Sequence, residues 1–347
     1  MKVTDTYITG TGHWLPQTVT SQWAVEAGLY SQQDRDADGF IGACVEKELA
    51  PPQMAVNAAR NAIDSAGIAP YDIAVVFHSS IWFQGVDMWP SASYVAAHAA
   101  HSGARAFDLQ QQCNVGLGGM ELASQLLTAI PDGNILMTTA DRFGAERIDR
   151  WKTENGVVYG DGAGAIVLSR NPGAFRILST FTQAENDLEK VVRGPEFHEN
   201  PEAGIIDITS RFTHFIGTGG MREAAGRLVA AVKNSVAGAL ADADSEIGEM
   251  AHVVIPAVGR TKLDWQLQEL IPVDLDRTNW SFASTTGHLG SGDQFVGLSA
   301  LQSAGTLNDG DKVLLVGGGA GFTCTSVVLE YSTTNFGSAP STEEKKS

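Results

Sequence analysis

The sequence predicts an α/β protein made of two similar halves rich in βαβ units, and three observations support this prediction. Strand-like segments such as residues 73–78 and 312–316 are unbroken apolar runs, as expected for strands covered by helices on both faces. Turns rich in small residues directly precede helical patterns in both halves. The same order of elements then recurs, which indicates one internal duplication rather than a short-period repeat.

The composition of the 347-residue chain limits the cellular compartment and the classes of partner that can be expected for it. Hydrophobic residues make up 43% of it, enough for a large core. The formal net charge of −17 and the pI of about 4.8 argue against nucleic acid and anionic membranes as partners, although such a charge also serves solubility. The chain has three scattered cysteines, and we expect neither a signal peptide nor a membrane-spanning segment. We therefore expect a cytoplasmic protein without disulfides, metal or a bound cofactor.

Strand and helix patterns alternate through the first half. Residues 34–39 have alternating acidic side chains but no closing glutamate at the spacing of a calcium loop, so we interpret them as a solvated loop. His78 ends an apolar strand and is either a satisfied core histidine, which we favour, or a pocket-lining residue. The predicted elements are strands at 6–16, 73–78, 133–141 and 160–169 and helices at 54–66, 93–104 and 120–127.

The stretch 107–120 organises the first half. A short apolar pattern leads to Cys113, and small residues and a helical pattern follow it. A cysteine at the start of a helix lies at the positive end of the helix dipole, which favours the thiolate. The neighbouring glycines allow another backbone or a substrate to approach closely. These features favour a nucleophile over the alternative, a cysteine that is simply buried.

The second half repeats this order, with His288 before a helix where the first half has Cys113. An Asp-Gly turn and an apolar strand follow each of these helices. If a pseudo-twofold axis relates the halves, the two helix-start turns face each other, and Cys113 and His288 share one site. The predicted elements are strands at 176–183, 252–256, 312–321 and 322–331 and helices at 221–241 and 294–304.

Three motifs together resemble the β-ketoacyl-ACP synthase III type of thiolase-fold protein. They are the cysteine turn at 108–119, the glycine-rich segment 160–165 and the closing segment 317–323. The resemblance covers nearly the whole chain and implies the thiolase fold, an α/β protein with duplicated halves in a five-layered αβαβα arrangement. The implied boundaries are 1–172 for the half with the nucleophilic cysteine, 173–335 for the half with the histidine and aspartate, and 336–347 for a flexible tail.

Two departures from the family pattern affect the expected reaction. Condensing enzymes of the family carry Pro-His-Gln-Ala-Asn where this chain reads Pro-Ala-Val-Gly-Arg at 256–260, and Gly-Asn-Thr-Ser where it reads Gly-His-Leu-Gly at 287–290. In the family, that His and Asn stabilise the enolate formed when a malonyl thioester loses carbon dioxide. Ala257 has no such donor, and the loss of one costs about 3 kcal/mol of transition-state stabilisation. The resemblance therefore implies weak or absent decarboxylative condensation.

His288 and Asp293 stand five residues apart across a turn with two glycines. This spacing lets the carboxylate fold back onto one ring nitrogen, which fixes the tautomer and leaves the other nitrogen as a base. With Cys113 the two form a nucleophile, a base and an orienting carboxylate. The pattern resembles the family's antibiotic-pathway acyltransferases, a subgroup that includes the cervimycin malonyl transferase. A helix-capping and packing pair is the alternative interpretation.

The resemblance implies two half-reactions in secondary-metabolite biosynthesis. Cys113 attacks an acyl thioester of CoA or of a carrier protein, and the backbone N–H groups of Cys113 and Ala320 bind the oxyanion. His288 then deprotonates a hydroxyl or amine of a small acceptor, such as a sugar or an aminocyclitol, which attacks the acyl-cysteine.

The donor site is less well defined in the sequence. Trp89 matches the position where relatives place an aromatic that reaches into the partner's acyl pocket in a homodimer, or it is a core tryptophan. The family's CoA-contacting segment is not recognisable at 39–44, which favours a carrier protein as donor. An acidic carrier requires a local basic patch on a chain of net charge −17, unless these cations are simply solvated. The candidate cations are Arg147, Arg150, Arg260 and Lys262.

Two other functions fit the sequence less well than acyl transfer. One is a condensing or starter-priming ketosynthase of a polyketide pathway, in which His288 has taken over a new catalytic role; Ala257 argues against it. The other is a non-catalytic scaffold that keeps the fold, and the intact Cys113 with a nearby base argues against that.

Overall fold

The protein is described by a computed structural model that covers residues 1–130, 133–144, 146–195, 197 and 204–334. Its first half contains β1 (Tyr7–Trp14), β2 (Thr18–Thr20), α1 (Ser21–Glu26), α2 (Gln32–Asp38), β3 (Gly42–Cys44), α3 (Pro51–Ala66), β4 (Ile73–Ser79), α4 (Ser91–Ala99), β5 (Arg105–Leu109), α5 (Val115–Leu127), β6 (Asn134–Asp141) and β7 (Gly162–Ser169). Its second half contains β8 (Phe175–Ala184), α6 (Lys190–Arg193), α7 (Ile208–Gly217), α8 (Met221–Asp242), β9 (Met250–Val254), α9 (Arg260–Glu269), α10 (Trp280–Thr286), α11 (Asp293–Ser303), β10 (Lys312–Gly319) and β11 (Thr323–Tyr331).

Nine of the strands form one mixed sheet in the order β5-β4-β6-β7-β1-β8-β11-β10-β9. Each half contributes a parallel part, β5-β4-β6 or β10-β9, and an antiparallel part next to the junction. The halves join where Tyr7 and Ile8 of β1 pair with Arg176 and Phe175 of β8. The two sheet layers of the expected five-layered arrangement are thus linked edge to edge. This pairing satisfies backbone groups that two separate edge strands would leave open.

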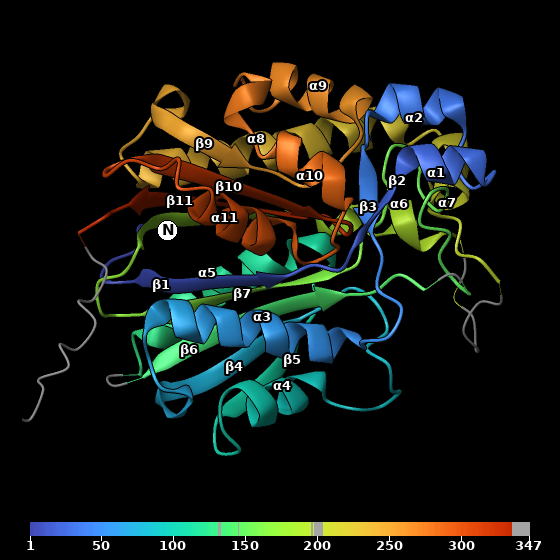
Figure 1. The fold of residues 1–347 in the computed structure, drawn as a ribbon. Coiled ribbons are helices and arrows are strands. Elements are labelled where there is room, and N and C mark those ends of the chain that lie inside the picture. The colour runs from blue at the N-terminus through green and yellow to red at the C-terminus, as the bar shows by residue number, and fades with distance from the viewer. Residues whose placement is uncertain (131–132, 145, 196, 198–203, 335–347) are drawn as a thin grey trace, which may run out of the picture.

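The elements stack in five layers, as expected for the thiolase fold (Figure 1). Helices α5 and α11 form the middle layer, because each packs against strands of both halves. Helices α3 and α4 cover the outer face of the first half, and α8 covers that of the second. Most of α5 is buried, including Leu117 and Met120, as expected for a helix between two sheet layers. The α/β thiolase-fold prediction is therefore confirmed.

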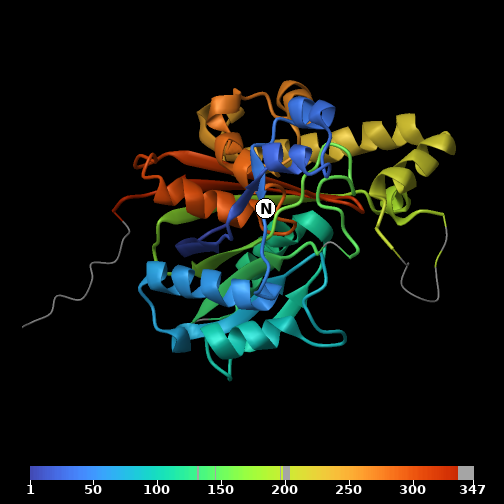
Figure 2. The same ribbon diagram turned by 45° about the vertical axis from the view of Figure 1, so that its right-hand side comes forward.

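Several segments differ from the elements that the sequence predicted, among them α1, α9 and α10, for which no helix was predicted. Residues 34–39 belong mostly to α2. The helix begins after Ser31, whose hydroxyl accepts a hydrogen bond from the N–H of Asp34, and it ends at Gly39, which has φ 71. Ser31 and Gly39 are its N-cap and C-cap. Asp34 and Asp36 lie on the exposed face of this short helix, whereas Asp38 is buried and accepts a hydrogen bond from the Tyr30 hydroxyl. Helices α6 and α7 were not predicted; together with the start of α8 they project from the side of the molecule (Figure 2).

The predicted boundary at residue 172 falls between β7 and β8, and the two-half division stays a prediction because the halves share one sheet. The predicted tail at 336–347 lies outside the described residues. Across the part of the chain that the structure describes, we find no helix with the length and apolar character needed to span a bilayer.

Candidate active site

Cys113 lies on a single turn of 3-10 helix, Gln112–Asn114, between β5 and α5. It is partly exposed, whereas Asn114 beside it is fully buried. The Asn114 side chain donates to the Thr325 hydroxyl (2.9 Å) and accepts from the Thr325 N–H (3.0 Å). Gln112 adopts the left-handed φ of 51, which is unfavourable for a side chain of this kind. The cysteine is therefore held at the apex of a strained turn that is tied to β11.

His288 links the two predicted partners. Its Nε2 lies 3.1 Å from Cys113 Sγ, and its Nδ1 lies 2.5 Å from Asp293 Oδ2. His288 and Asp293 are each 6% exposed. The structure therefore brings the three residues together in the order nucleophile, imidazole, carboxylate.

The backbone around the imidazole is also fixed. His288 N–H donates to the Val158 carbonyl (2.7 Å), and the N–H of Leu289 donates to Asp293 Oδ1 (2.8 Å). Asp293 Oδ2 accepts a further hydrogen bond from the N–H of Ala257 (2.9 Å). Because Asp293 is the first residue of α11, its carboxylate also lies at the positive end of a helix dipole. These contacts hold the Asp293 carboxyl group in place against His288.

The electrostatics favour a charged imidazolium. Burial by itself lowers the pKa of His288, but the Asp293 carboxylate and the Cys113 thiolate outweigh it and hold that pKa well above its ordinary value. An imidazolium next to a sulfur stabilises the thiolate, which is the nucleophilic form. The geometry therefore places a charged imidazolium within hydrogen-bond distance of the Cys113 sulfur.

The two helix-start turns approach each other closely. A Cβ added at Gly116, in the first turn of α5, would lie 3.0 Å from the Ser291 carbonyl oxygen. The end of β10 also packs against the Cys113 turn, since a Cβ at Gly319 would lie 2.4 Å from the Gln111 carbonyl oxygen. The glycines that the sequence singled out thus allow three segments to meet around Cys113.

Tyr159 is a site residue that the sequence prediction missed. Its ring centroid lies 5.6 Å from that of His288, and its hydroxyl donates to Glu154 Oε2 (2.9 Å). Burial and the charges of Glu154 and Cys113 raise its pKa well above the ordinary value, so the phenol stays neutral. The position immediately before the glycine-rich segment 160–165 was the available signal. Its contact with the imidazole depends on the fold.

Comparison with known proteins identifies the family to which this chain is similar. The family described as 3-oxoacyl-(acyl-carrier-protein) synthase III matches residues 107–186, and its C-terminal counterpart matches residues 240–331. A solved structure named ChlB3, described as an acyltransferase, has 32% sequence identity, covers 96% of this chain and 99% of its own, and superposes with a TM-score of 0.92. The chain belongs to the synthase III family.

Curated members of the synthase III family are more distant in sequence. The β-ketoacyl-(acyl-carrier-protein) synthase III of Aquifex aeolicus (strain VF5) is 24% identical over 94% of this chain and 99% of its own length. The solved structure of 3-oxoacyl-(acyl-carrier-protein) synthase III from Aquifex aeolicus VF5 has a TM-score of 0.77 at 22% identity, over 94% of this chain and all of its own, which shows the shared fold. These findings confirm the prediction of a thiolase-superfamily enzyme.

The predicted donor-site cations differ in their surroundings. Arg150 turns inward and pairs with the fully buried Asp161 (3.0 Å), so its guanidinium already has an anionic partner, and its role in donor binding stays a prediction. Lys262 contacts Glu154 (3.4 Å) at the edge of the site. Arg260 pairs with Asp264 (2.8 Å), and Arg147 donates to a backbone carbonyl. Lys262 and Arg260 remain the exposed candidates.

Two other predicted features can be located in the fold. Trp89 lies in the segment between β4 and α4, is 36% exposed and packs edge-on against Tyr94. His78 is fully buried and bonds Thr138 and Gln84, as expected for a core histidine. Among the described residues, no group of three or more metal-ligating side chains is found.

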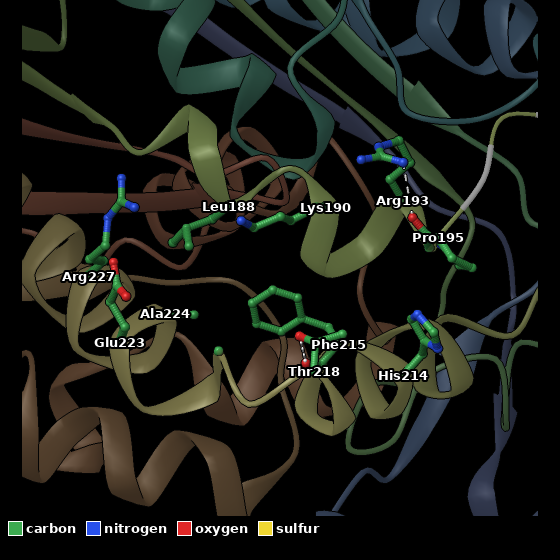
Figure 3. Close-up of a pocket in the computed structure, with 12 residues that line it drawn as sticks. Leu188, Lys190, Arg193, Pro195, His214, Phe215, Thr218, Glu223, Ala224 and Arg227 are labelled. Atoms are coloured by element: carbon green, nitrogen blue, oxygen red, sulfur yellow. Dashed lines mark hydrogen bonds between the residues drawn. The ribbon is translucent and has the colours of Figure 1, made fainter.

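A hollow of about 370 Å³ lies outside this synthase III site, between α6, α7 and the start of α8 (Figure 3). Leu188 and Phe215 form part of its buried apolar floor. Arg193 and Arg227 on its rim are each paired with a glutamate. None of its lining residues belongs to the Cys113 group, and its arginines already have anionic partners.

Proposed function

We propose that this enzyme is an acyltransferase that takes an acyl group from a thioester onto Cys113 and passes it to a hydroxyl or amine. The observation that carries the proposal is the buried imidazole of His288, bonded to Asp293 on one nitrogen and to Cys113 on the other. Such an imidazole can protonate one leaving group and deprotonate the next nucleophile.

In the first half-reaction the Cys113 thiolate attacks the carbonyl carbon of the donor thioester. The backbone N–H groups of Cys113 and Ala320 are proposed to bind the oxyanion that forms. As the intermediate collapses, the carbon–sulfur bond to the donor breaks, and the imidazolium of His288 gives its proton to the departing thiolate. The products are acyl-Cys113, a free donor thiol and a neutral His288.

The second half-reaction uses the neutral imidazole as a base. In the acyl-enzyme the thiolate charge is gone, and with it one of the causes that hold the pKa of His288 high. Nε2 then takes the proton of an acceptor hydroxyl or amine as it attacks the acyl carbon. Collapse expels the Cys113 thiolate and restores the thiolate–imidazolium pair, while Asp293 keeps the ring oriented throughout.

The surroundings of Ala257 argue against decarboxylative condensation. Its side chain is a buried methyl group, 1% exposed, and its N–H is already bonded to Asp293. No side-chain donor is therefore present at this position to stabilise an enolate. The similarity to ChlB3, an acyltransferase, points the same way. Condensation remains the second candidate because the curated relatives are β-ketoacyl synthases.

For the substrates we propose an acyl-carrier-protein or acyl-CoA donor and a sugar or aminocyclitol acceptor in a secondary-metabolite pathway, as in the antibiotic-pathway subgroup with the cervimycin malonyl transferase. Lys262 and Arg260, exposed on α9 near the site, are the proposed contacts for the donor's phosphate groups. Lys262→Gln is expected to raise the donor KM several-fold with little change in kcat, since an exposed cation contributes modestly.

A homodimer is proposed from the surface at the edge strand β5. This strand is the first in the sheet order, so one of its edges has no neighbour in the described structure. Phe107 on β5 is 49% exposed. Met88 and Trp89, which precede α4 in the sequence, are also exposed. A second copy would cover this apolar surface and pair the open edge. Phe107→Asp is expected to convert the dimer to a monomer in light scattering.

One experiment tests the proposed reaction. The enzyme is incubated with acyl thioesters, and its intact mass is read, with Cys113→Ala as the control. The isolated acyl-enzyme is then offered malonyl thioester or a panel of sugars and aminocyclitols. Transfer to a sugar or cyclitol supports the proposal, whereas discharge by malonyl thioester with release of carbon dioxide would establish the condensing reaction instead.

A further inference from the structure

Asp141, at the end of β6, is a fully buried carboxylate that no part of the proposed reaction uses. Its Oδ1 accepts hydrogen bonds from the N–H groups of Ile81 and Trp82, both at 2.9 Å. Its Oδ2 accepts from the N–H of Ser291 (3.0 Å) and from the Ser291 hydroxyl (2.8 Å). One side chain thus joins two segments that are about two hundred residues apart in the chain.

Both segments belong to the surroundings of the site. Ser291 stands three residues after His288 in the turn that leads into α11, and its carbonyl oxygen faces Gly116 at the start of α5. Ile81 and Trp82 begin the segment that continues to Trp89, the proposed acyl-pocket residue. Asp141 therefore fixes the His288 turn relative to both the Cys113 helix and the segment that leads to the acyl pocket.

The chemistry of this contact requires a carboxylate. All of the groups that face Asp141 at hydrogen-bond distance are donors, and an ionised carboxylate is the side chain that only accepts. Among the described residues, no lysine or arginine pairs with Asp141, in contrast to Asp161, which pairs with Arg150. Burial raises the pKa of Asp141 to about 6, although its hydrogen bonds oppose this shift. An unpaired buried charge of this kind is costly for stability alone, which suggests a role in the site.

We propose that Asp141 is a positioning residue, which holds the His288 turn in place so that the imidazole stays bonded to Cys113. The proposal concerns the contact between His288 and Cys113 and does not need the acyl-transfer reaction; its extension to the acyl pocket rests on the proposed function. Asp141→Asn keeps the shape but turns an NH₂ group towards backbone N–H groups. At least one donor then loses its partner, and the turn must shift.

The test measures the rate at which iodoacetamide alkylates Cys113 across a range of pH, read by intact mass. Cys44 and Cys324 do not interfere, because burial raises the pKa of each thiol to about 11. In Asp141→Asn we expect at least a tenfold slower alkylation at neutral pH and a profile displaced to higher pH. The matched control is Asp38→Asn, another buried carboxylate whose pKa is raised by burial but which bonds Tyr30. It is expected to alkylate within twofold of the wild type.

A second variant protects the test against a folding defect. At Gly290, with φ 63, an added Cβ would lie 2.6 Å from Asp141 Oδ2, so Gly290→Ala disturbs the same contact from the turn side. Ser291→Ala removes one donor and is expected to cause a smaller change of the same sign.

Two results separate this proposal from the proposed function. A folded Asp141→Asn or Gly290→Ala enzyme with a wild-type alkylation profile overturns the positioning role, whatever the enzyme transfers. Conversely, if these variants shift the profile but the wild type accepts no acyl group from any thioester, the positioning role stands and the acyltransferase proposal fails.

Discussion

The turn that carries Cys113 and the turn that carries His288 occupy equivalent places in the two halves, yet they are built differently. Each precedes a helix of the middle layer, α5 or α11. The Cys113 turn is partly exposed and strained at Gln112, whereas the His288 turn is buried and bonded on every side. Its hydrogen-bond partners are Val158, Asp141 and Asp293, and Ala257 in turn donates to Asp293.

This difference shows that two equivalent turns of a duplicated fold can serve two different roles. A nucleophile must be reached by a thioester, so its turn stays open at one side. The base gains and loses a proton during the reaction, and its charged form must be stabilised. Its turn is therefore closed off from water, because a fixed carboxylate interacts more strongly with the imidazolium in a site without water. The following predictions, from the largest effect to the smallest, test this division.

Loss of the nucleophile should have the largest effect. Cys113→Ala is expected to abolish acyl loading and to lower overall transfer by at least about 10⁴-fold, because no covalent intermediate can form. Cys44→Ala and Cys324→Ala are the matched controls, since both thiols are buried. Intact mass after incubation with a thioester measures loading. Acylation of the Cys113→Ala enzyme at another residue would contradict the assignment.

Loss of the base should affect both half-reactions. His288→Ala is expected to slow discharge of a preformed acyl-enzyme by about 10² to 10⁴-fold, the usual contribution of general acid–base catalysis. His214→Ala, an exposed histidine on the rim of the hollow, serves as the control. Single-turnover kinetics with the isolated acyl-enzyme measure this step. An unchanged discharge rate would show that another group takes the acceptor's proton.

A buried ion pair stabilises the segment that packs against the His288 turn. Arg150 bonds Asp161, and it also donates to the carbonyl of Tyr159, next to the imidazole. Arg150→Met should lower the free energy of unfolding by about 3–5 kcal/mol, because Asp161 is left charged and unpaired. Arg176→Met, which breaks the exposed pair with Glu330, should cost about 0–1 kcal/mol. Urea unfolding measures both; equal losses would refute the difference in burial.

Close approach of the two turns should be sensitive to a single methyl group. In Gly116→Ala the new Cβ meets the Ser291 carbonyl, so we expect a loss of about 1 kcal/mol of stability after the gain in helix propensity is subtracted, and a slower acyl loading. Gly226→Ala in α8 has open space around its Cβ and should stabilise the protein by about 0.5–1 kcal/mol. Thermal unfolding distinguishes the two. A stabilised Gly116→Ala enzyme would mean that the turns can separate.

The charge state of His288 should follow that of Cys113. Carboxamidomethylation makes the sulfur neutral, so the pKa of His288 measured by NMR should be lower in the alkylated than in the free enzyme. Correspondingly, discharge of the acyl-enzyme should speed up about tenfold per pH unit until the imidazole is neutral, and then level off. A pKa that does not move on alkylation would mean that Asp293 alone sets it.

The same raised pKa has a consequence for stability. A histidine whose pKa is higher in the folded than in the unfolded chain stabilises the protein fully below the unfolded value of about 6.5. This contribution is lost as the pH rises through the folded value. The wild type should therefore lose more stability than His288→Ala on going from neutral to alkaline pH.

Much of the fold could be predicted because its signals are local. The predicted strand at 73–78 and helix at 54–66 match β4 and α3 to within a few residues, since apolar runs and helical periodicity are properties of short segments. Helices α2, α6 and α7 were missed, because their helical patterns are short and mostly exposed.

In the site, the sequence by itself determined which side chains could do the chemistry. Cys113 before a helix, His288 and Asp293 across a glycine turn, and Ala257 in place of a histidine are all visible in the sequence. The tertiary structure decided what each one meets. It placed Tyr159 against His288, turned Arg150 inward to Asp161, and put Asp141 behind the His288 turn. These contacts join residues far apart in the chain, so they depend on how the layers pack and not on any local pattern.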